Sequence, residues 1–72
     1  MKKVFKMQDL DCANCAAKME AAIAKIEGVE KASVNFMTQK LTLDAEDARL
    51  ESVLDEAERI IKKIEPDCVL VR

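Results

Sequence analysis

Two cysteines separated by two residues carry the clearest chemistry that this sequence offers. They lie in the stretch Leu10-Asp11-Cys12-Ala13-Asn14-Cys15, where a short strand is expected to give way to a helix. Thiolates bind soft or borderline metal ions such as Cu(I), Zn(II), Cd(II) and Pb(II). Because Cys12 and Cys15 are close enough for both sulfurs to bind one ion, we interpret the stretch as a surface metal site.

Asp11, directly before the first cysteine, discriminates among these ions. With two thiolates and this carboxylate, a monovalent ion leaves the site at −2 and a divalent ion leaves it at −1. Uncompensated charge in a partly desolvated loop is costly. The carboxylate also offers an oxygen that Zn(II), Cd(II) or Pb(II) accepts and linear Cu(I) does not favour. Asp11 therefore predicts a divalent ion, although an aspartate here is also expected if it only caps the helix.

Three protein ligands, Asp11, Cys12 and Cys15, leave a tetrahedral ion one position short, which suits a site that passes its ion on. Cys15 is expected in the first helical turn, where unpaired N–H groups and the helix dipole favour a thiolate, so we predict a lowered pKa for its thiol. Glu65 is the candidate for an additional ligand, from the same chain or from a neighbouring molecule. Cys68 is expected to be a small buried residue and not a ligand.

The composition excludes several classes of function. The 72 residues are expected to form a single domain, 1–72. Histidine is absent, which removes imidazole ligands and His-based catalysis, so we expect a binding module and not an enzyme. Dispersed lysines and arginines and a shortage of aromatic residues argue against nucleic acid. No apolar run reaches the ~20 residues that cross a bilayer, and the paired cysteines are typical of reduced thiols in the cytoplasm.

Apolar periodicity predicts the elements that position the thiols. Strands are expected at 3–8, 31–36, 40–43 and 68–71. A first helix is expected to begin after Cys12 and to be stopped by Gly28 as its C′ glycine, and a second to follow the acidic segment 44–47 and run to about residue 63. The order βαββαβ predicts an α+β, ferredoxin-like fold, a four-stranded antiparallel sheet with both helices on one face. In that topology the thiol loop, the link 37–39 and the connection 65–67 meet at one end of the sheet.

Several segments resemble a known family, the heavy-metal-associated domain, and are most similar to the N-terminal domains of zinc/cadmium/lead-exporting P-type ATPases. The resemblance implies that Cys12 and Cys15 are the metal thiolates and that Asp11 is the extra ligand of the divalent-ion subgroup. It also implies a cytosolic domain whose partners are the remaining domains of a membrane transporter. The family commonly has glycine at the position of Asp9. The similar segments are Leu10 to Lys18, Ile26 to Val29, Val34 to Phe36 and Ile64 to Asp67.

Other functions compete with this interpretation. A free-standing Cu(I) metallochaperone of the same fold would use the same thiols. A thiol–disulfide oxidoreductase is less well supported, because Asp11 precedes the motif and an acidic neighbour opposes a thiolate. The third alternative is an interaction module with idle thiols. We expect a monomer, with a metal-bridged dimer as the alternative, and no membrane contact by the domain itself. The ligand set suits Zn(II), Cd(II) and Pb(II) equally.

Overall fold

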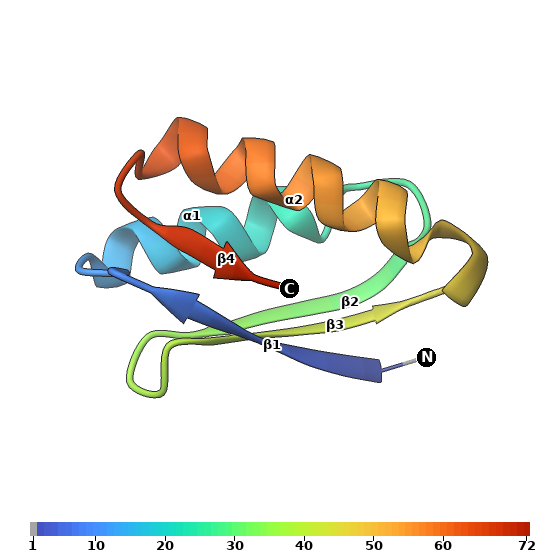
Figure 1. The fold of residues 1–72 in the computed structure, drawn as a ribbon, viewed down its shortest axis with the longest axis horizontal. Coiled ribbons are helices and arrows are strands. Elements are labelled where there is room, and N and C mark those ends of the chain that lie inside the picture. Colours follow the sequence, from blue (N-terminus) through green and yellow to red (C-terminus); the bar gives the residue numbers. More distant parts are fainter. Residues whose placement is uncertain (1) are drawn as a thin grey trace.

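Two helices cover one face of a four-stranded antiparallel sheet in the computed structural model, which describes residues 2–72 (Figure 1). The strands pair in the spatial order β2-β3-β1-β4. This is the ferredoxin-like βαββαβ arrangement predicted from the sequence. The elements are β1 (Lys2–Gln8), α1 (Ala13–Ile23), β2 (Val29–Asn35), β3 (Lys40–Ala45), a 3-10 turn (Asp47–Arg49), α2 (Leu50–Ile64) and β4 (Val69–Val71).

Apolar side chains alone fill the space between the sheet and the helices. Leu41, Leu43 and Ala45 alternate along β3 and are buried, as the period of two in a half-buried strand requires. Within residues 2–72, no polar or charged residue is buried. The polar and charged side chains of these residues therefore lie at least partly at the surface. The other buried residues are Met7, Leu10, Ala16, Met19, Ile23, Val53, Leu54, Ala57, Ile61, Cys68 and Leu70.

The first helix is shorter than the sequence predicted. α1 ends at Ile23, and the chain then turns, with the Ile26 N–H donating to the Ile23 carbonyl (3.1 Å). Ile26 still packs against the core from this turn, which explains why its spacing imitated a longer helix. Gly28 does adopt a left-handed φ of +96°, but it leads into β2 and is not the C′ residue of α1. The predicted helical role of Gly28 was therefore wrong.

Three connections lie together at one end of the sheet, which we call the thiol end (Figure 1). They are the loop between β1 and α1, the β2–β3 hairpin and the connection from α2 to β4. The opposite, far end holds the turn from α1 to β2 and the passage from β3 into α2. None of the helices within residues 2–72 has the length and apolar character needed to cross a bilayer.

The β2–β3 hairpin closes without glycine, by means of two polar side chains. The Asn35 side-chain oxygen accepts hydrogen bonds from the backbone N–H groups of Met37 (3.0 Å) and Thr38 (3.1 Å). Gln39 then takes a left-handed φ of +57°, a conformation that is uncommon for a residue other than glycine. The turn signal of this hairpin is therefore an asparagine cap, which is a recognised device of tight turns.

Candidate metal centre

Cys12 begins helix α1 by capping it with its own sulfur. Its backbone is extended (φ −130°, ψ 116°), and its Sγ accepts a hydrogen bond from the Cys15 N–H at 3.2 Å. The Cys12 carbonyl accepts the first helical bond, from the Ala16 N–H at 3.0 Å. Both cysteines are half-buried, and all three cysteines of the chain are free thiols. The predicted strand-to-helix position of the motif is therefore confirmed.

The pKa of Cys15 shifts in the opposite direction to the sequence prediction, and the lowered pKa is that of Cys12. Hydrogen bonds from the Cys15 side chain and the Cys15 backbone to Cys12 lower the pKa of the Cys12 thiol. The same contact with Cys12, together with burial and a hydrogen bond to Glu65, raises the pKa of Cys15 to about 11. The helix N-terminus does stabilise a thiolate, but its N–H group points to the capping sulfur, so Cys12 receives the benefit.

Glu65, in the connection between α2 and β4, lies close to both thiols although it is distant from them in sequence. Its backbone is held on both sides, since its N–H donates to the Ile61 carbonyl (2.8 Å) and its carbonyl accepts from the Cys68 N–H (3.0 Å). Within residues 2–72, Cys12, Cys15 and Glu65 form the one group of potential metal ligands whose ligand atoms all lie within 4.8 Å of one another. In the same part of the chain, the Glu65 Oε2 atom is the buried side-chain oxygen or nitrogen without a hydrogen-bond partner.

Asp11 lies at the surface beside this group and not within it. The side chain of Asp11 is exposed, and among residues 2–72 its oxygens do not join the group of Cys12, Cys15 and Glu65. Asp11 does not cap the helix, because the cap residue is Cys12. The capping explanation of Asp11 is therefore wrong, and its role as a metal ligand stays a prediction.

Cys68 is buried beneath the site, as predicted. Its side chain has 0% exposure. Burial raises the pKa of the Cys68 thiol, and the carboxylates of Glu65, Asp9 and Asp11 add to the effect. Cys68 is fully buried and lies outside the group of Cys12, Cys15 and Glu65, so it packs in the core.

Gln39 also contacts this loop, although nothing in the sequence analysis assigned it a role. Its side-chain carboxamide donates to the Leu10 carbonyl (2.6 Å) and accepts from the Leu10 N–H (3.0 Å), across a separation of 29 residues. A single sequence gives no signal for such a contact, since a glutamine in a turn is ordinarily solvated. The thiol loop is thus attached to the β2–β3 hairpin.

Two sulfurs and one carboxylate oxygen make a mixed donor set. Sulfur suits soft ions, oxygen suits harder ones, and the combination suits borderline divalent ions that are normally four-coordinate. The set is half-buried and not enclosed, so an exchanging ligand can reach it. The arrangement can therefore bind a metal ion.

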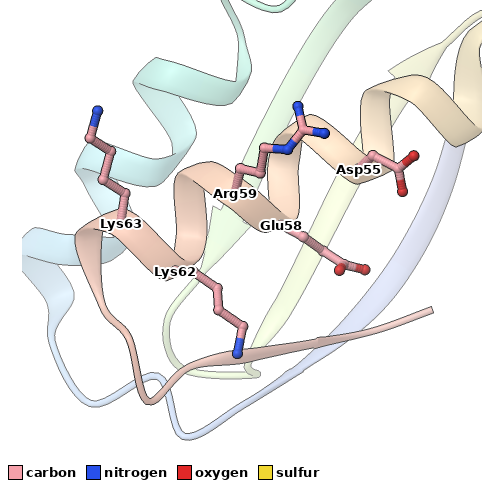
Figure 2. Close-up of a pocket in the computed structure, with 5 residues that line it drawn as sticks. All are labelled: Asp55, Glu58, Arg59, Lys62 and Lys63. Carbon is pink, nitrogen blue, oxygen red and sulfur yellow. The ribbon is translucent and has the colours of Figure 1, made fainter.

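A hollow lies on α2 (Figure 2). It is lined by side chains of both signs that point out from the helix, Asp55, Glu58, Arg59, Lys62 and Lys63. Arg72, in the last position of the chain, forms salt bridges with Asp55 (2.8 Å) and Glu58 (3.3 Å). This mixture of charges is typical of a solvated helix face.

The chain is similar to parts of much longer transport proteins. It is 33% identical over 66 residues to the cadmium, zinc and cobalt-transporting ATPase of Bacillus subtilis, a match that covers 92% of this chain and 9% of that protein. It is 41% identical over 56 residues to the zinc/cadmium/lead-transporting P-type ATPase of Escherichia coli, covering 74% of this chain and 8% of that protein. The chain thus spans less than a tenth of the length of these curated relatives.

Solved structures share the fold over nearly the whole chain. The N-terminal domain of ZntA in its Zn(II) form is 32% identical, with a TM-score of 0.69, and the match covers 96% of this chain and 86% of that one. The CopZ metallochaperone, at 18% identity and a TM-score of 0.74, covers 99% of this chain and 100% of its own, and shows the fold alone. The family model of the heavy-metal-associated domain matches residues 4–69. The chain therefore belongs to the heavy-metal-associated domain family, as its motif, fold and thiol pair together indicate.

Proposed function

We propose that this domain binds one divalent soft metal ion, Zn(II), Cd(II) or Pb(II), through Cys12, Cys15 and Asp11, with Glu65 as an additional ligand. The observation that carries the proposal is the Glu65 carboxylate, which lies with both thiol sulfurs inside one 4.8 Å group and has a buried oxygen without a partner. A cation bound to both sulfurs and to the Glu65 carboxylate would compensate the charge of all three groups at once. The ion is cargo for the domain and not a resident cofactor.

Charge favours a divalent ion in this group. Two thiolates and the Glu65 carboxylate carry −3 together, so a monovalent ion leaves −2 and a divalent ion leaves −1. Asp11 adds a further negative charge at the exposed edge of the loop. Because uncompensated charge is costly in a half-buried site, both carboxylates select for higher ionic charge. They also supply the oxygen donors that Zn(II) accepts and that a two-sulfur Cu(I) site does not need.

We further propose that the domain is the cytosolic N-terminal regulatory or delivery domain of a heavy-metal-exporting P-type ATPase. The curated relatives are named as transporting ATPases, and this chain matches only a small part of each. The partially exposed thiols support transfer, because an incoming ligand from another domain can attack the ion without unfolding the site. The domain acts as a monomer, and a metal-bridged dimer is the alternative in which a second copy completes the coordination.

A Cu(I) metallochaperone is the second candidate function. The N-terminal domain of a potential copper-translocating P-type ATPase from Bacillus subtilis, solved in the Cu(I)-loaded state, is 28% identical to this chain with a TM-score of 0.75. Metal preference separates the two functions. A Cu(I) carrier needs the two sulfurs and gains nothing from Glu65 or Asp11.

A competition titration of the reduced domain tests the proposal. Zn(II), Cd(II), Pb(II) and Cu(I) are each titrated against a chelator of known affinity, and the sulfur-to-metal charge-transfer absorption of the Cd(II) form reports thiolate ligation. Glu65→Gln and Asp11→Asn remove one carboxylate each. The matched controls are Asp67→Asn and Asp9→Asn, which remove a neighbouring exposed carboxylate from the same connection or loop.

We expect the Glu65 and Asp11 variants to lower the affinity for divalent ions while their controls change it much less. If the carboxylates acted only through their charge, each variant and its control would lose the same affinity for divalent ions. If neither variant weakens divalent binding and Cu(I) binds unchanged, the divalent assignment is wrong and the copper function is favoured. If the Cd(II) form shows no charge-transfer band, the thiolates do not bind the ion and the proposed metal site is wrong.

A further inference from the structure

The side chain of Gln39 makes a two-point contact with the backbone of the thiol loop. Its carboxamide NH₂ donates to the Leu10 carbonyl at 2.6 Å, and its oxygen accepts from the Leu10 N–H at 3.0 Å. The same NH₂ donates to the Phe36 carbonyl at 3.1 Å, which lies in the hairpin itself. One glutamine therefore binds to both segments and satisfies both backbone groups of one residue in the loop.

The backbone of Gln39 reinforces this contact. Its carbonyl accepts a hydrogen bond from the Met7 N–H at 2.8 Å, at the end of β1. Gln39 thus holds the chain on both sides of Asp9, whose φ of +60° is left-handed. Such a conformation in a residue other than glycine is sparsely populated and persists where the surroundings hold it. The side chain of Leu10 is 1% exposed, so the core holds the same residue from the inside.

This fixed point lies close to the metal ligands along the chain. Only Asp11 separates Leu10 from Cys12, and each residue spans at most ~3.6 Å. Cys12 in turn accepts the N–H of Cys15 at its sulfur. A displacement of Leu10 therefore moves Cys12 and the start of α1, while Glu65 is fixed independently by its bonds to Ile61 and Cys68. The distance between the thiols and Glu65 depends on where Leu10 is held.

We propose that Gln39 is a positioning residue of the metal site, which sets metal affinity by holding the thiol loop in register with Glu65. The inference rests on the proposed metal-binding function of Cys12 and Cys15. Gln39 does not touch the ion. Outer contacts that orient metal ligands typically contribute 10- to 100-fold in affinity, so an effect of roughly tenfold is expected.

The alternative is that Gln39 only closes the hairpin. Its bond to Phe36 and its left-handed backbone serve that purpose, and Asn35 caps the same turn. The two roles are separable because, within residues 2–72, the Asn35 side chain accepts hydrogen bonds from Met37 and Thr38 and makes none with Leu10. Asn35→Ala is therefore the matched control, since it weakens the hairpin and leaves the contact to Leu10 in place.

The test compares Gln39→Gly, Gln39→Met and Asn35→Ala with the unmodified domain. Gln39→Gly removes the carboxamide. Because glycine adopts a left-handed backbone without a steric penalty, this variant loses the contact to Leu10 without adding backbone strain. Methionine keeps the length of the side chain without its hydrogen bonds. The first measurement is amide hydrogen exchange at Leu10 and Cys15 in the reduced, metal-free domain. The second is the Cd(II) affinity, determined by competition with a chelator. The third is the intensity of the charge-transfer band at saturating Cd(II).

Both Gln39 variants are expected to exchange the Leu10 amide faster and to bind Cd(II) roughly tenfold more weakly. The saturated charge-transfer intensity stays unchanged, because the ligands are the same. Asn35→Ala is expected to retain the affinity of the unmodified domain. The proposal would be overturned if Asn35→Ala lost as much Cd(II) affinity as the Gln39 variants. It would also be overturned if both Gln39 variants bound Cd(II) within twofold of the unmodified domain.

The two proposals fail in different ways. If Cys12→Ser and Cys15→Ser bind Cd(II) as well as the unmodified domain, the proposed function fails. The exchange measurement needs no metal, so it still decides whether Gln39 holds the loop: unchanged Leu10 exchange in Gln39→Gly and Gln39→Met overturns the positioning role by itself.

Discussion

The two ends of the sandwich accommodate their turns in different ways. At the far end, glycine occupies the left-handed position, with Gly28 at φ +96°. The nearby Arg49 has a half-exposed side chain and pairs with Glu27 (3.6 Å) and Glu46 (3.7 Å). Exposed pairs of this kind contribute little to stability. Within residues 2–72, the far end thus has no left-handed residue other than glycine and no buried polar side-chain atom without a hydrogen-bond partner.

At the thiol end, residues with side chains occupy the strained positions. Asp9 and Gln39 have φ values of +60° and +57°, and Glu65 has a buried oxygen without a partner. Strained or unsatisfied groups in native proteins concentrate at functional sites, where a ligand or a specific contact compensates them. The comparison indicates that the far end is arranged for stability and the thiol end for binding.

Replacing a thiol is expected to have the largest effect. Cys12→Ser or Cys15→Ser should weaken Cd(II) binding by roughly 100-fold or more, because a hydroxyl does not replace a thiolate for a soft ion. Cys68→Ala is the matched control, since Cys68 is buried outside the ligand group. It should lower the free energy of unfolding and leave Cd(II) affinity unchanged. An affinity loss in Cys68→Ala equal to that in the Cys12 variant would contradict the assignment.

The two thiols of the site should also differ in reactivity. Cys12 has a lowered pKa because the side chain and backbone of Cys15 bond to its sulfur, whereas Cys15 has a pKa raised to about 11 by the reciprocal contact, burial and Glu65. At pH 8, Cys12 therefore carries more thiolate, and iodoacetamide should alkylate it more than tenfold faster than Cys15, even though a less acidic thiolate is the better nucleophile. The difference should shrink as the pH rises toward 11. Peptide mapping by mass spectrometry checks the order of labelling.

Glu65→Gln should separate binding from stability at the thiol end. It removes the negative charge beside the sulfurs and is expected to weaken divalent binding roughly tenfold. The free energy of unfolding of the metal-free domain should not fall, because the substitution replaces a carboxylate whose buried oxygen has no partner with an uncharged amide, which costs less to bury. Chemical denaturation checks the second point. A loss of stability without a loss of affinity would make Glu65 a structural residue.

Gly28→Ala should give the opposite result at the far end. A Cβ there would lie 2.8 Å from the Arg49 Cδ atom, and the left-handed φ disfavours any side chain. Arg49 is flexible and can move, so the backbone dominates, and the free energy of unfolding should fall by ~1–2 kcal/mol. Cd(II) affinity should be unchanged. A parallel loss of affinity would show that the two ends are not independent.

Asp9→Gly is expected to have the smallest effect. It relieves a left-handed conformation in a residue that tolerates it better than most, so the free energy of unfolding should rise by up to ~1 kcal/mol. Asp9→Asn removes the charge but keeps that tolerance, and should leave stability within ~0.5 kcal/mol. Thermal denaturation of both variants checks the result. A lower melting temperature for Asp9→Gly would mean that the Asp9 side chain stabilises the loop.

The sequence predicts the fold well because periodicity is a local property. Alternation in β3 and the apolar spacing of α2 identify their buried faces directly. The end of α1 was misplaced, because Ile26 packs on the core from a turn and imitates a helical position. Helix ends depend on tertiary contacts that periodicity does not record.

The candidate site is predictable only in part. Cys12 and Cys15 are adjacent in sequence, so their pairing is a local signal, and topology brings Glu65 to the same end. The pKa of Cys15 was predicted to be lowered but is raised, because its side chain contacts the sulfur of Cys12, which also accepts the N–H at the start of the helix. The contact of Gln39 with Leu10 joins residues 29 positions apart, and no local pattern in a single sequence predicts such a contact.

The sulfur of Cys12 is both a proposed ligand of the ion and the acceptor that anchors the first turn of α1 through the Cys15 N–H. When an ion replaces the proton at this sulfur, its charge changes, and the amide bound to it experiences that change directly. Occupancy of the surface loop is thereby transmitted into a helix that packs along the sheet. A partner that touches only the beginning of this helix could distinguish the loaded domain from the empty one without contacting the metal.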